Sequence, residues 1–239
     1  MKENIMSTNR SISISGNQVH IWQSNLLNPE SAVDRLYHEV LSDDERVKSD
    51  RLRSLIDRGK FIGARAGLRI ILSKYLDLRP EEIVFCYTEH GKPLIDSKHN
   101  TSSINFNLSH SNNHALYAIA QNRRVGVDIE HMRQIRKADR IIQKHFSPQE
   151  ADYYHTHPAN KKQEAFFKLW TRKEAYTKAK GIGIRMPRNQ IELSLVPTET
   201  DTELGWRINE LKVETGYVAA LVVEGKEYQV INMRLSALT

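Results

Sequence analysis

Four charged residues in two short segments have the types and the spacing of a metal site. Asp128 and Glu130 lie two positions apart in the stretch VGVDIE, so an extended strand would direct both carboxylates to one face. Glu174 and Lys178 lie four positions apart in FFKLWTRKEAYTKAK, so a helix would place them one turn apart on one side. Carboxylates held close together repel one another, and a hard divalent cation relieves that repulsion. We therefore expect Asp128, Glu130 and Glu174 to converge on an ion such as Mg²⁺.

Two simpler interpretations compete with this one. Acids at alternate positions are also typical of a solvated strand face, and Glu174 with Lys178 is also typical of an exposed helical ion pair worth about 0.2–0.5 kcal/mol. The apolar stripe of the same helix, which includes Phe166 and Trp170, favours the site because it puts the charged pair beside the packed face of the helix. Gly126, on the strand face of the acids, is expected to leave room for a phosphate.

The surrounding sequence predicts helices and strands in a repeated order. Residues 29–78 are rich in Leu, Arg and Ala and contain S-D-D-E, which is typical of a helix start; Pro80 ends this helical region. A second helix is expected over 161–180, closed by Gly181 and Gly183. Strands are expected at 83–95 (a hairpin turning near His90 and Gly91), 104–111, 114–121, 125–130, 190–196, 206–213, 217–223 and 228–235.

The order helix, strands, helix, strands occurs twice, with matching elements about 105 residues apart. The helix containing FIGARAGLRIIL precedes HALYAIA as the helix containing FFKLWTRKEAYTKA precedes YVAALVV. This repetition predicts an α+β fold of two similar halves, residues 1–122 and 123–239, related by pseudo-twofold symmetry. The acids of VGVDIE come directly after the joint, so we expect them to face a cleft between the halves, where ligand sites are common.

Composition and charge limit the class of protein. A chain of 239 residues is long enough for one large domain or two small ones. The formal charge of +6 indicates an anionic partner such as nucleic acid, a polyphosphate cofactor or an acidic protein, or else a merely basic protein. Cys86 is alone, which excludes an internal disulfide. The first residues lack the apolar region of a secretory signal and the apolar run 217–223 is too short to cross a bilayer, so we expect a cytoplasmic protein without membrane contacts.

Four motifs in order along the chain carry a resemblance to a known family. They are GKPLI (91–95), FNLSHS (106–111), VGVD (125–128) and F-x-x-x-W-x-x-K-E-A-x-x-K (166–178). Together they resemble the signature of the 4′-phosphopantetheinyl transferases. The length and the doubled architecture resemble the surfactin-type (Sfp-type) branch. The short holo-acyl-carrier-protein synthases build their sites between subunits, so this chain is expected to act as a monomer.

The resemblance implies a reaction and a metal centre. The phosphopantetheine arm of coenzyme A would pass to a serine of an apo acyl or peptidyl carrier protein, with release of adenosine 3′,5′-bisphosphate, as in holo-acyl-carrier-protein synthase activity. Asp128, Glu130 and Glu174 become the ligands of Mg²⁺, with Mn²⁺ as an alternative. Lys178 would contact the phosphates and stabilise the leaving bisphosphate.

The resemblance also assigns coenzyme A contacts and a base. The expected coenzyme A contacts are Lys48, Arg65, Lys92, Ser109, His110 and Lys178. Glu150, in SPQE, occupies the family position proposed for the base that takes the serine proton. The same SPQE sequence is typical of a capping box, in which Glu150 merely caps a helix, and a carboxylate beside the ion is a second route for the proton. Residues 131–144 are basic and are expected either to dock the acidic carrier protein or to form an ordinary charged helix.

Three other functions remain as alternatives. A nucleic-acid-binding protein would explain the charge, but between Arg46 and Arg79 the only aromatic residues are Phe61 and Tyr75, and that function predicts basic residues interleaved with aromatic ones. Another Mg²⁺-dependent phosphotransferase or phosphodiesterase would use the acids but has no need for GKP and FNLSHS. A catalytically idle binding protein would have no need for the acids together with Lys178. The sequence therefore predicts carrier protein and coenzyme A as partners, and no nucleic acid.

Overall fold

The computed structural model describes residues 11–27, 29–182, 189, 193, 205–225 and 227–236. The helices are α1 (Glu30–Glu39), α2 (Asp43–Asp50), α3 (Leu55–Leu76), the short 3-10 helix η1 (Pro80–Glu82), α4 (Ala138–His145), α5 (Pro148–Thr156) and α6 (Ala159–Lys180). The strands are β1 (Gln18–Asn25), β2 (Phe85–Tyr87), β3 (Pro93–Ile95), β4 (Ile104–Ser111), β5 (His114–Gln121), β6 (Val125–His131), β7 (Trp206–Glu210), β8 (Tyr217–Glu224) and β9 (Gln229–Arg234). None of the described helices is long and apolar enough to span a membrane.

Helix-capping residues divide the region 29–78, which the sequence predicts as helical, into three helices. Ser42 begins α2 with a capping box in which the Glu45 side chain accepts the Ser42 N–H at 3.2 Å. Ser54 begins α3 and accepts the Asp57 N–H at 3.2 Å. The predicted strands and hairpin are confirmed apart from two differences. The strand predicted over 206–213 ends at Glu210, and most of 190–196, with Gly183, lies outside the described residues.

The two halves repeat one strand order. In the first half β4 pairs with β5 and β5 with β1; in the second half β7 pairs with β8 and β8 with β6, all antiparallel. Ile21 of β1 faces Ala118 across its ladder, as Val127 of β6 faces Leu221. The long helices α3 and α6 each have 22 residues and each precede the matching strands. The predicted α+β fold with two similar halves is confirmed.

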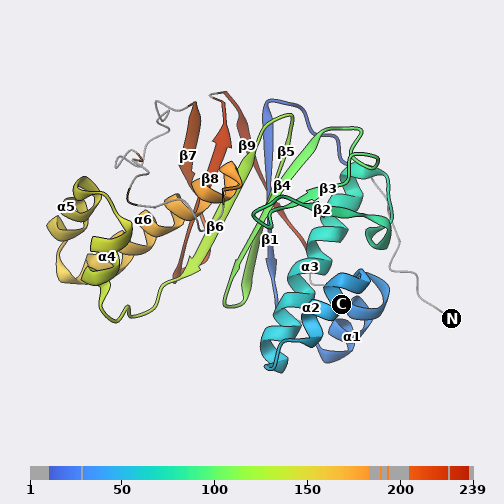
Figure 1. Ribbon diagram of the computed structural model, residues 1–239, viewed down its shortest axis with the longest axis horizontal. Coiled ribbons are helices and arrows are strands. Elements are labelled where there is room, and N and C mark those ends of the chain that lie inside the picture. The colour runs from blue at the N-terminus through green and yellow to red at the C-terminus, as the bar shows by residue number, and fades with distance from the viewer. Residues whose placement is uncertain are drawn as a thin grey trace.

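The halves meet through the inner faces of their sheets. Val19 and Ile21 from the first sheet form one buried cluster with Val125, Val127 and Leu221 from the second. Helix α3 covers the outer face of the first sheet and α6 covers the outer face of the second, which gives the order helix, sheet, sheet, helix in Figure 1.

The last strand does not follow the division into halves. β9 pairs in parallel with β1 and so joins the sheet of the first half, although it follows β8 in the chain. In Figure 1 its red ribbon crosses behind the middle of the molecule towards blue β1. The division at residues 122 and 123 stays a prediction, and β9 is an exception to it.

The edge strands β4 and β6 are joined by side chains instead of a backbone ladder. Three side chains at alternate positions of β4 accept successive outward N–H groups of β6, which would otherwise be unpaired at a sheet edge. The bonds are Asn107 Oδ1 to the Val127 N–H at 2.9 Å, Ser109 Oγ to the Ile129 N–H at 3.3 Å and Ser111 Oγ to the His131 N–H at 3.0 Å. We call this contact the β4–β6 seam.

Candidate active site and metal centre

Asp128 is the most buried of the predicted metal ligands. It lies on β6 with 5% of its surface exposed, and its Oδ1 accepts hydrogen bonds from Lys178 Nζ at 2.6 Å and Ser109 Oγ at 2.9 Å. Burial raises the pKa of its carboxyl to about 6, against the opposing effects of Lys178 and Ser109; the negative charge of Glu174 raises it further. Its Oδ2 is buried and has no hydrogen-bond partner among the described residues. A buried carboxylate oxygen without a donor is suited to bind a cation.

Helix α6 brings Glu174 and Lys178 to Asp128 because it packs unusually close to β6. A Cβ atom on Gly126 would lie 2.1 Å from the Ala175 carbonyl oxygen and 2.4 Å from the Ala179 backbone nitrogen. The expectation that Gly126 leaves room for a phosphate is therefore wrong: the glycine leaves room for the helix backbone.

Glu130 takes up a different environment from the other two acids. Its Oε2 accepts hydrogen bonds from Ser111 Oγ at 2.9 Å and from the exposed Arg133 Nη1 at 3.2 Å. Among the residues that the structure describes, no three Asp, Glu, His or Cys side chains are grouped closely enough to hold one ion. The structure thus brings together Asp128 and Glu174, and leaves Glu130 one step away on the same strand face. The sequence analysis missed Ser111 and Arg133, although the alternation N-x-S-x-S in β4 is a visible signal for the former.

A cavity of about 380 Å³ opens beside Lys178. The hairpin turn 90–93 and Asn107 and Leu108 of β4 line it from the first half, and Glu174 and Lys178 of α6 line it from the second. Both halves therefore contribute to one concave surface with a carboxylate and an ammonium group in it. Such a surface suits a phosphate-bearing ligand that also binds a cation.

Lys92, predicted to contact coenzyme A, also lines this cavity, but its ammonium group lies on the backbone of the second half. It donates to the carbonyl oxygens of Lys178 at 2.7 Å and Ala179 at 3.2 Å, at the end of α6. Burial lowers the pKa of Lys92 to about 8, and the positive charge of Arg124 lowers it further. In this position Lys92 stabilises the C-terminal turn of the helix that carries Lys178.

The two other predicted contacts, Arg65 and Lys48 from the helical region, bind groups other than the predicted metal ligands. Arg65 Nε donates to the buried Glu45 at 2.6 Å, and Arg69 Nε donates to the second oxygen of the same carboxylate at 2.6 Å. Lys48 is exposed and donates to the Tyr87 hydroxyl at 3.2 Å. The structure thus gives Arg65 a buried partner, and sequence reasoning missed both Glu45 and Arg69.

Ser109 and His110 point to opposite sides of β4. The Ser109 hydroxyl donates to Asp128 and accepts from Lys178 Nζ at 2.9 Å, so it lies inside the site. His110 as a whole residue is exposed, but protein atoms partly desolvate its ring; this desolvation lowers its pKa, as do the positive charges of Lys178 and Lys60. A neutral ring among ammonium groups can take up a proton when an anion binds there.

Glu150 has the capping geometry that SPQE predicts. Its carboxylate accepts the Ser147 N–H at 2.8 Å and forms an ion pair with Lys173 Nζ at 2.7 Å. Glu150 is 2% exposed and Lys173 1% exposed; burial raises the pKa of Glu150, against the opposing charge of Lys173. The cap and the buried ion pair account for the position of Glu150, and its role as the base stays a prediction.

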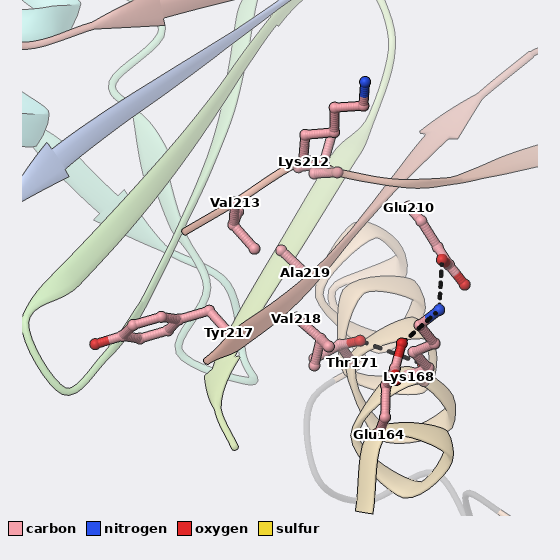
Figure 2. A pocket seen from close by; sticks show the side chains of 10 residues that line it. Glu164, Lys168, Thr171, Glu210, Lys212, Val213, Tyr217, Val218 and Ala219 are labelled. Carbon is pink, nitrogen blue, oxygen red and sulfur yellow. Dashed lines mark hydrogen bonds and ion pairs between the residues drawn. The ribbon is translucent and has the colours of Figure 1, made fainter. Parts of the chain in front are cut away.

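A second cavity, of about 240 Å³, lies between α6 and the segment after β7 (Figure 2). Both of its carboxylates form ion pairs with one lysine: Lys168 Nζ lies 3.2 Å from Glu164 and 3.3 Å from Glu210. Dashed lines in Figure 2 mark these two ion pairs. Because both carboxylates are already paired with Lys168, this cavity is a poorer candidate for a site that binds a cation than the one beside Lys178.

Comparison with known proteins assigns the chain to a family. A model of the 4′-phosphopantetheinyl transferase superfamily matches residues 124–222, and a model of the N-terminal region of 4′-phosphopantetheinyl transferases matches residues 28–122. The chain is 36% identical over 221 residues to 4′-phosphopantetheinyl transferase HetI of Nostoc sp., covering 91% of this chain and 92% of HetI. It is 26% identical over 159 residues to 4′-phosphopantetheinyl transferase Sfp of Bacillus subtilis, covering 66% of this chain and 68% of Sfp. From this similarity along nearly its whole length, the chain belongs to the 4′-phosphopantetheinyl transferase superfamily and has Sfp-type relatives.

Proposed function

We propose that this chain transfers the phosphopantetheine arm of coenzyme A to a serine of an apo carrier protein, with Mg²⁺ as the metal. The observation that carries the proposal is the buried Asp128, with one oxygen on Lys178 Nζ at 2.6 Å, its other oxygen without a donor among the described residues, and Glu174 close enough to raise its pKa. Asp128 and Glu174, with Glu130 next on the strand, would hold the cation. Bound there, Mg²⁺ would neutralise the pyrophosphate of coenzyme A.

Lys178 has a defined part in the proposed reaction. The carrier serine Oγ forms a bond to the phosphorus that bears the pantetheine arm, and the bond from that phosphorus to the bridging oxygen of the pyrophosphate breaks. Adenosine 3′,5′-bisphosphate leaves with the electron pair. Lys178, which lines the cavity, is positioned to neutralise the charge that develops on the phosphate oxygens, because positioning and charge neutralisation supply most of the catalysis of phosphoryl transfer.

The proton of the serine must pass to a base, and Glu150 is the candidate that the family resemblance supplies. Its burial on Lys173 and its role as a cap support a structural function instead. A Glu150→Gln variant separates the two, since Gln can still accept the Ser147 N–H. A structural role predicts lower stability but a rate per folded molecule within about tenfold of the original enzyme and an unchanged acidic limb of the pH–rate profile. A rate roughly 10²-fold lower or more, with that limb lost, assigns the base to Glu150.

The carrier protein is expected to dock beside β6. Five exposed basic residues follow Glu130 directly, in the segment leading into α4 and in α4 itself: Arg133, Arg136, Lys137, Arg140 and Lys144. Ile142, on the inner face of α4, is buried, so the basic face of the helix points to solvent. An acidic carrier surface complements this charge, and docking there would bring its serine next to the site.

The test is intact-mass spectrometry of apo acyl and peptidyl carrier proteins incubated with this protein, coenzyme A and Mg²⁺. A mass gain of one phosphopantetheine arm, abolished by EDTA and restored by added Mg²⁺, supports reaction and metal together. Asp128→Ala is expected to reduce the rate by roughly 10³-fold. Full activity of Asp128→Ala, or of the original enzyme in EDTA, overturns the metal centre. Comparison of the two carrier classes decides whether holo-acyl-carrier-protein synthase activity describes this chain.

A further inference from the structure

We infer that two serines of the β4–β6 seam, Ser109 and Ser111, are positioning residues that fix the β6 carboxylates for the metal. The inference rests on the proposed metal-dependent function. It concerns in particular Ser111, which lies in the first half and contacts a predicted ligand in the second half.

The two serines make the same pair of contacts one step apart along the strands. Ser109 Oγ donates to Asp128 at 2.9 Å and accepts the N–H of the next residue, Ile129, at 3.3 Å. Ser111 Oγ donates to Glu130 at 2.9 Å and accepts the N–H of the next residue, His131, at 3.0 Å. Because side chains alternate with period two on both strands, one register keeps both serines opposite both acids. Each hydroxyl thus ties a carboxylate to the backbone that carries it.

The hydroxyl of Ser109 is fully used within the protein. A serine hydroxyl has one hydrogen and two lone pairs. In Ser109 the hydrogen goes to Asp128, while Lys178 Nζ at 2.9 Å and the Ile129 N–H occupy the acceptor side. A direct contact between Ser109 and a phosphate, which the family resemblance predicts, requires one of these bonds to break. Positioning of Asp128 and Lys178 explains the same residue without that requirement.

Ser111 holds Glu130 against the pull of a competing cation, the Arg133 guanidinium. Glu130 Oε2 is shared between Ser111 and Arg133, and the Arg133 side chain is 62% exposed. An exposed guanidinium on a flexible side chain can leave readily, whereas Ser111 is fixed by its strand and by the His131 N–H. Ser111 therefore holds Glu130 on the strand face of Asp128 whether or not Arg133 is in place. Residues that orient a metal-binding side chain in this way typically change metal affinity by 10- to 100-fold when removed.

The test measures binding of Mn²⁺ alone, by the loss of the electron paramagnetic resonance signal of free Mn²⁺, without coenzyme A or carrier. Ser111→Ala is expected to weaken Mn²⁺ binding roughly 10-fold or more. Ser111→Thr, which keeps the hydroxyl, is expected to restore it to within about threefold of the original protein. Ser73→Ala is the matched control, because Ser73 is a part-buried serine whose hydroxyl donates only to the Ile70 carbonyl of its own helix.

A double-mutant cycle with Glu130→Gln separates positioning from general damage. If Ser111 acts through Glu130, Ser111→Ala has little further effect on Mn²⁺ binding in the Glu130→Gln background. An equal loss in both backgrounds, or Ser111→Ala binding within about twofold of the original protein, overturns the inference while the metal centre stands. No Mn²⁺ binding by the folded original protein overturns the metal centre and this inference with it. Thermal unfolding of each variant shows that the protein measured is folded.

Discussion

The two halves of this protein share a charged support structure but differ in what they place beside it. In the first half Ser42 caps α2, and the capping Glu45 forms a buried ion pair with Arg69 of α3 at 2.6 Å. In the second half Ser147 caps α5, and the capping Glu150 pairs with Lys173 of α6 at 2.7 Å. The matching residues lie about 105 positions apart. The repeat therefore includes a buried ion pair that fixes each long helix to the preceding helix.

The strands beneath these helices show the difference. Where β6 has Asp128 facing α6, the matching position of β1 has Trp22, which packs on α3 and donates to the Tyr75 hydroxyl at 2.8 Å. Where β6 has Glu130, β1 has Ser24. One half fills the space between strand and helix with an aromatic side chain, and the other fills it with carboxylates and an ammonium group. The comparison supports a structural role for Glu45 and Glu150, and it supports the proposal that the carboxylates at positions 128 and 130 serve the reaction.

The largest expected effect on stability comes from removing one cation of each matching pair. Lys173→Met leaves Glu150 buried without its ion-pair partner and is expected to lower the free energy of unfolding by about 3–5 kcal/mol. Arg69→Met is expected to lose less through the ion pair, because Arg65 remains on Glu45, but it also removes the donor to the Pro80 and Ile83 carbonyl oxygens at 2.9 Å. Arg69→Lys, which keeps the charge, therefore provides the matched comparison. Urea unfolding measures all three variants, and a larger loss in Arg69→Lys than in Lys173→Met would contradict the comparison.

The second prediction concerns pH and the metal-free protein. The pKa of Asp128 is raised from 3.8 to about 6 on folding, so between these pH values the folded chain binds more protons than the unfolded chain. This group therefore lowers the free energy of unfolding as pH rises from about 4 to about 6, by up to about 3 kcal/mol. Asp128→Asn lacks that loss and is expected to gain stability relative to the original protein across this range, while it loses transferase activity.

Urea unfolding in EDTA at several pH values measures this difference. Parallel pH dependences for the original protein and Asp128→Asn would show that Asp128 has an ordinary pKa, and that the carboxylate is not desolvated as the structure indicates. Asp96→Asn is a suitable control because Asp96 contributes no buried carboxylate to the site.

The smallest expected effect is on Mn²⁺ binding, from the exposed Arg133 beside Glu130. Arg133 and a bound ion compete for Glu130, and an exposed ion pair contributes about 0–1 kcal/mol, so Arg133→Gln is expected to tighten Mn²⁺ binding by up to about fivefold. Arg136→Gln removes an equal charge from the same exposed segment and controls for general electrostatics. Equal effects of the two substitutions would show that Arg133 acts through net charge and does not compete for Glu130.

Most of the fold follows from periodicity and turn residues. The strands of β4, β5, β6 and β8 and the helix α6 lie where alternation, apolar stripes and the closing Gly181 predict them. The breaks between α1, α2 and α3 are harder to predict. Ser54 caps α3 because its backbone is extended there, and the sequence alone does not show that conformation. The pairing of β9 with β1 could not be predicted, since it depends on contacts between opposite ends of the chain.

The sequence predicts which residues form the site better than it predicts what each of them contacts. The motif identifies Asp128, Glu174 and Lys178, and the structure brings these three together. Spacing alone could not show that Gly126 faces the α6 backbone or that Lys92 faces the end of α6, since both depend on how closely the helix approaches the strand. The sequence also did not indicate the partners of Glu130, since its contacts with Ser111 and Arg133 depend on how β4 lies beside β6.

The crossing of β9 has a consequence for how the protein is made. Until residues 229–234 have left the ribosome, β1 is an open edge with unpaired backbone groups, although the rest of its sheet is complete well before them in the chain. The first half, which is synthesised first, is thus the last to be finished. Closure of such a long-range parallel pair is slow compared with local helices and hairpins, so nascent chains expose this edge for longest. This late-closing edge belongs to the half that lacks the proposed metal ligands Asp128, Glu130 and Glu174.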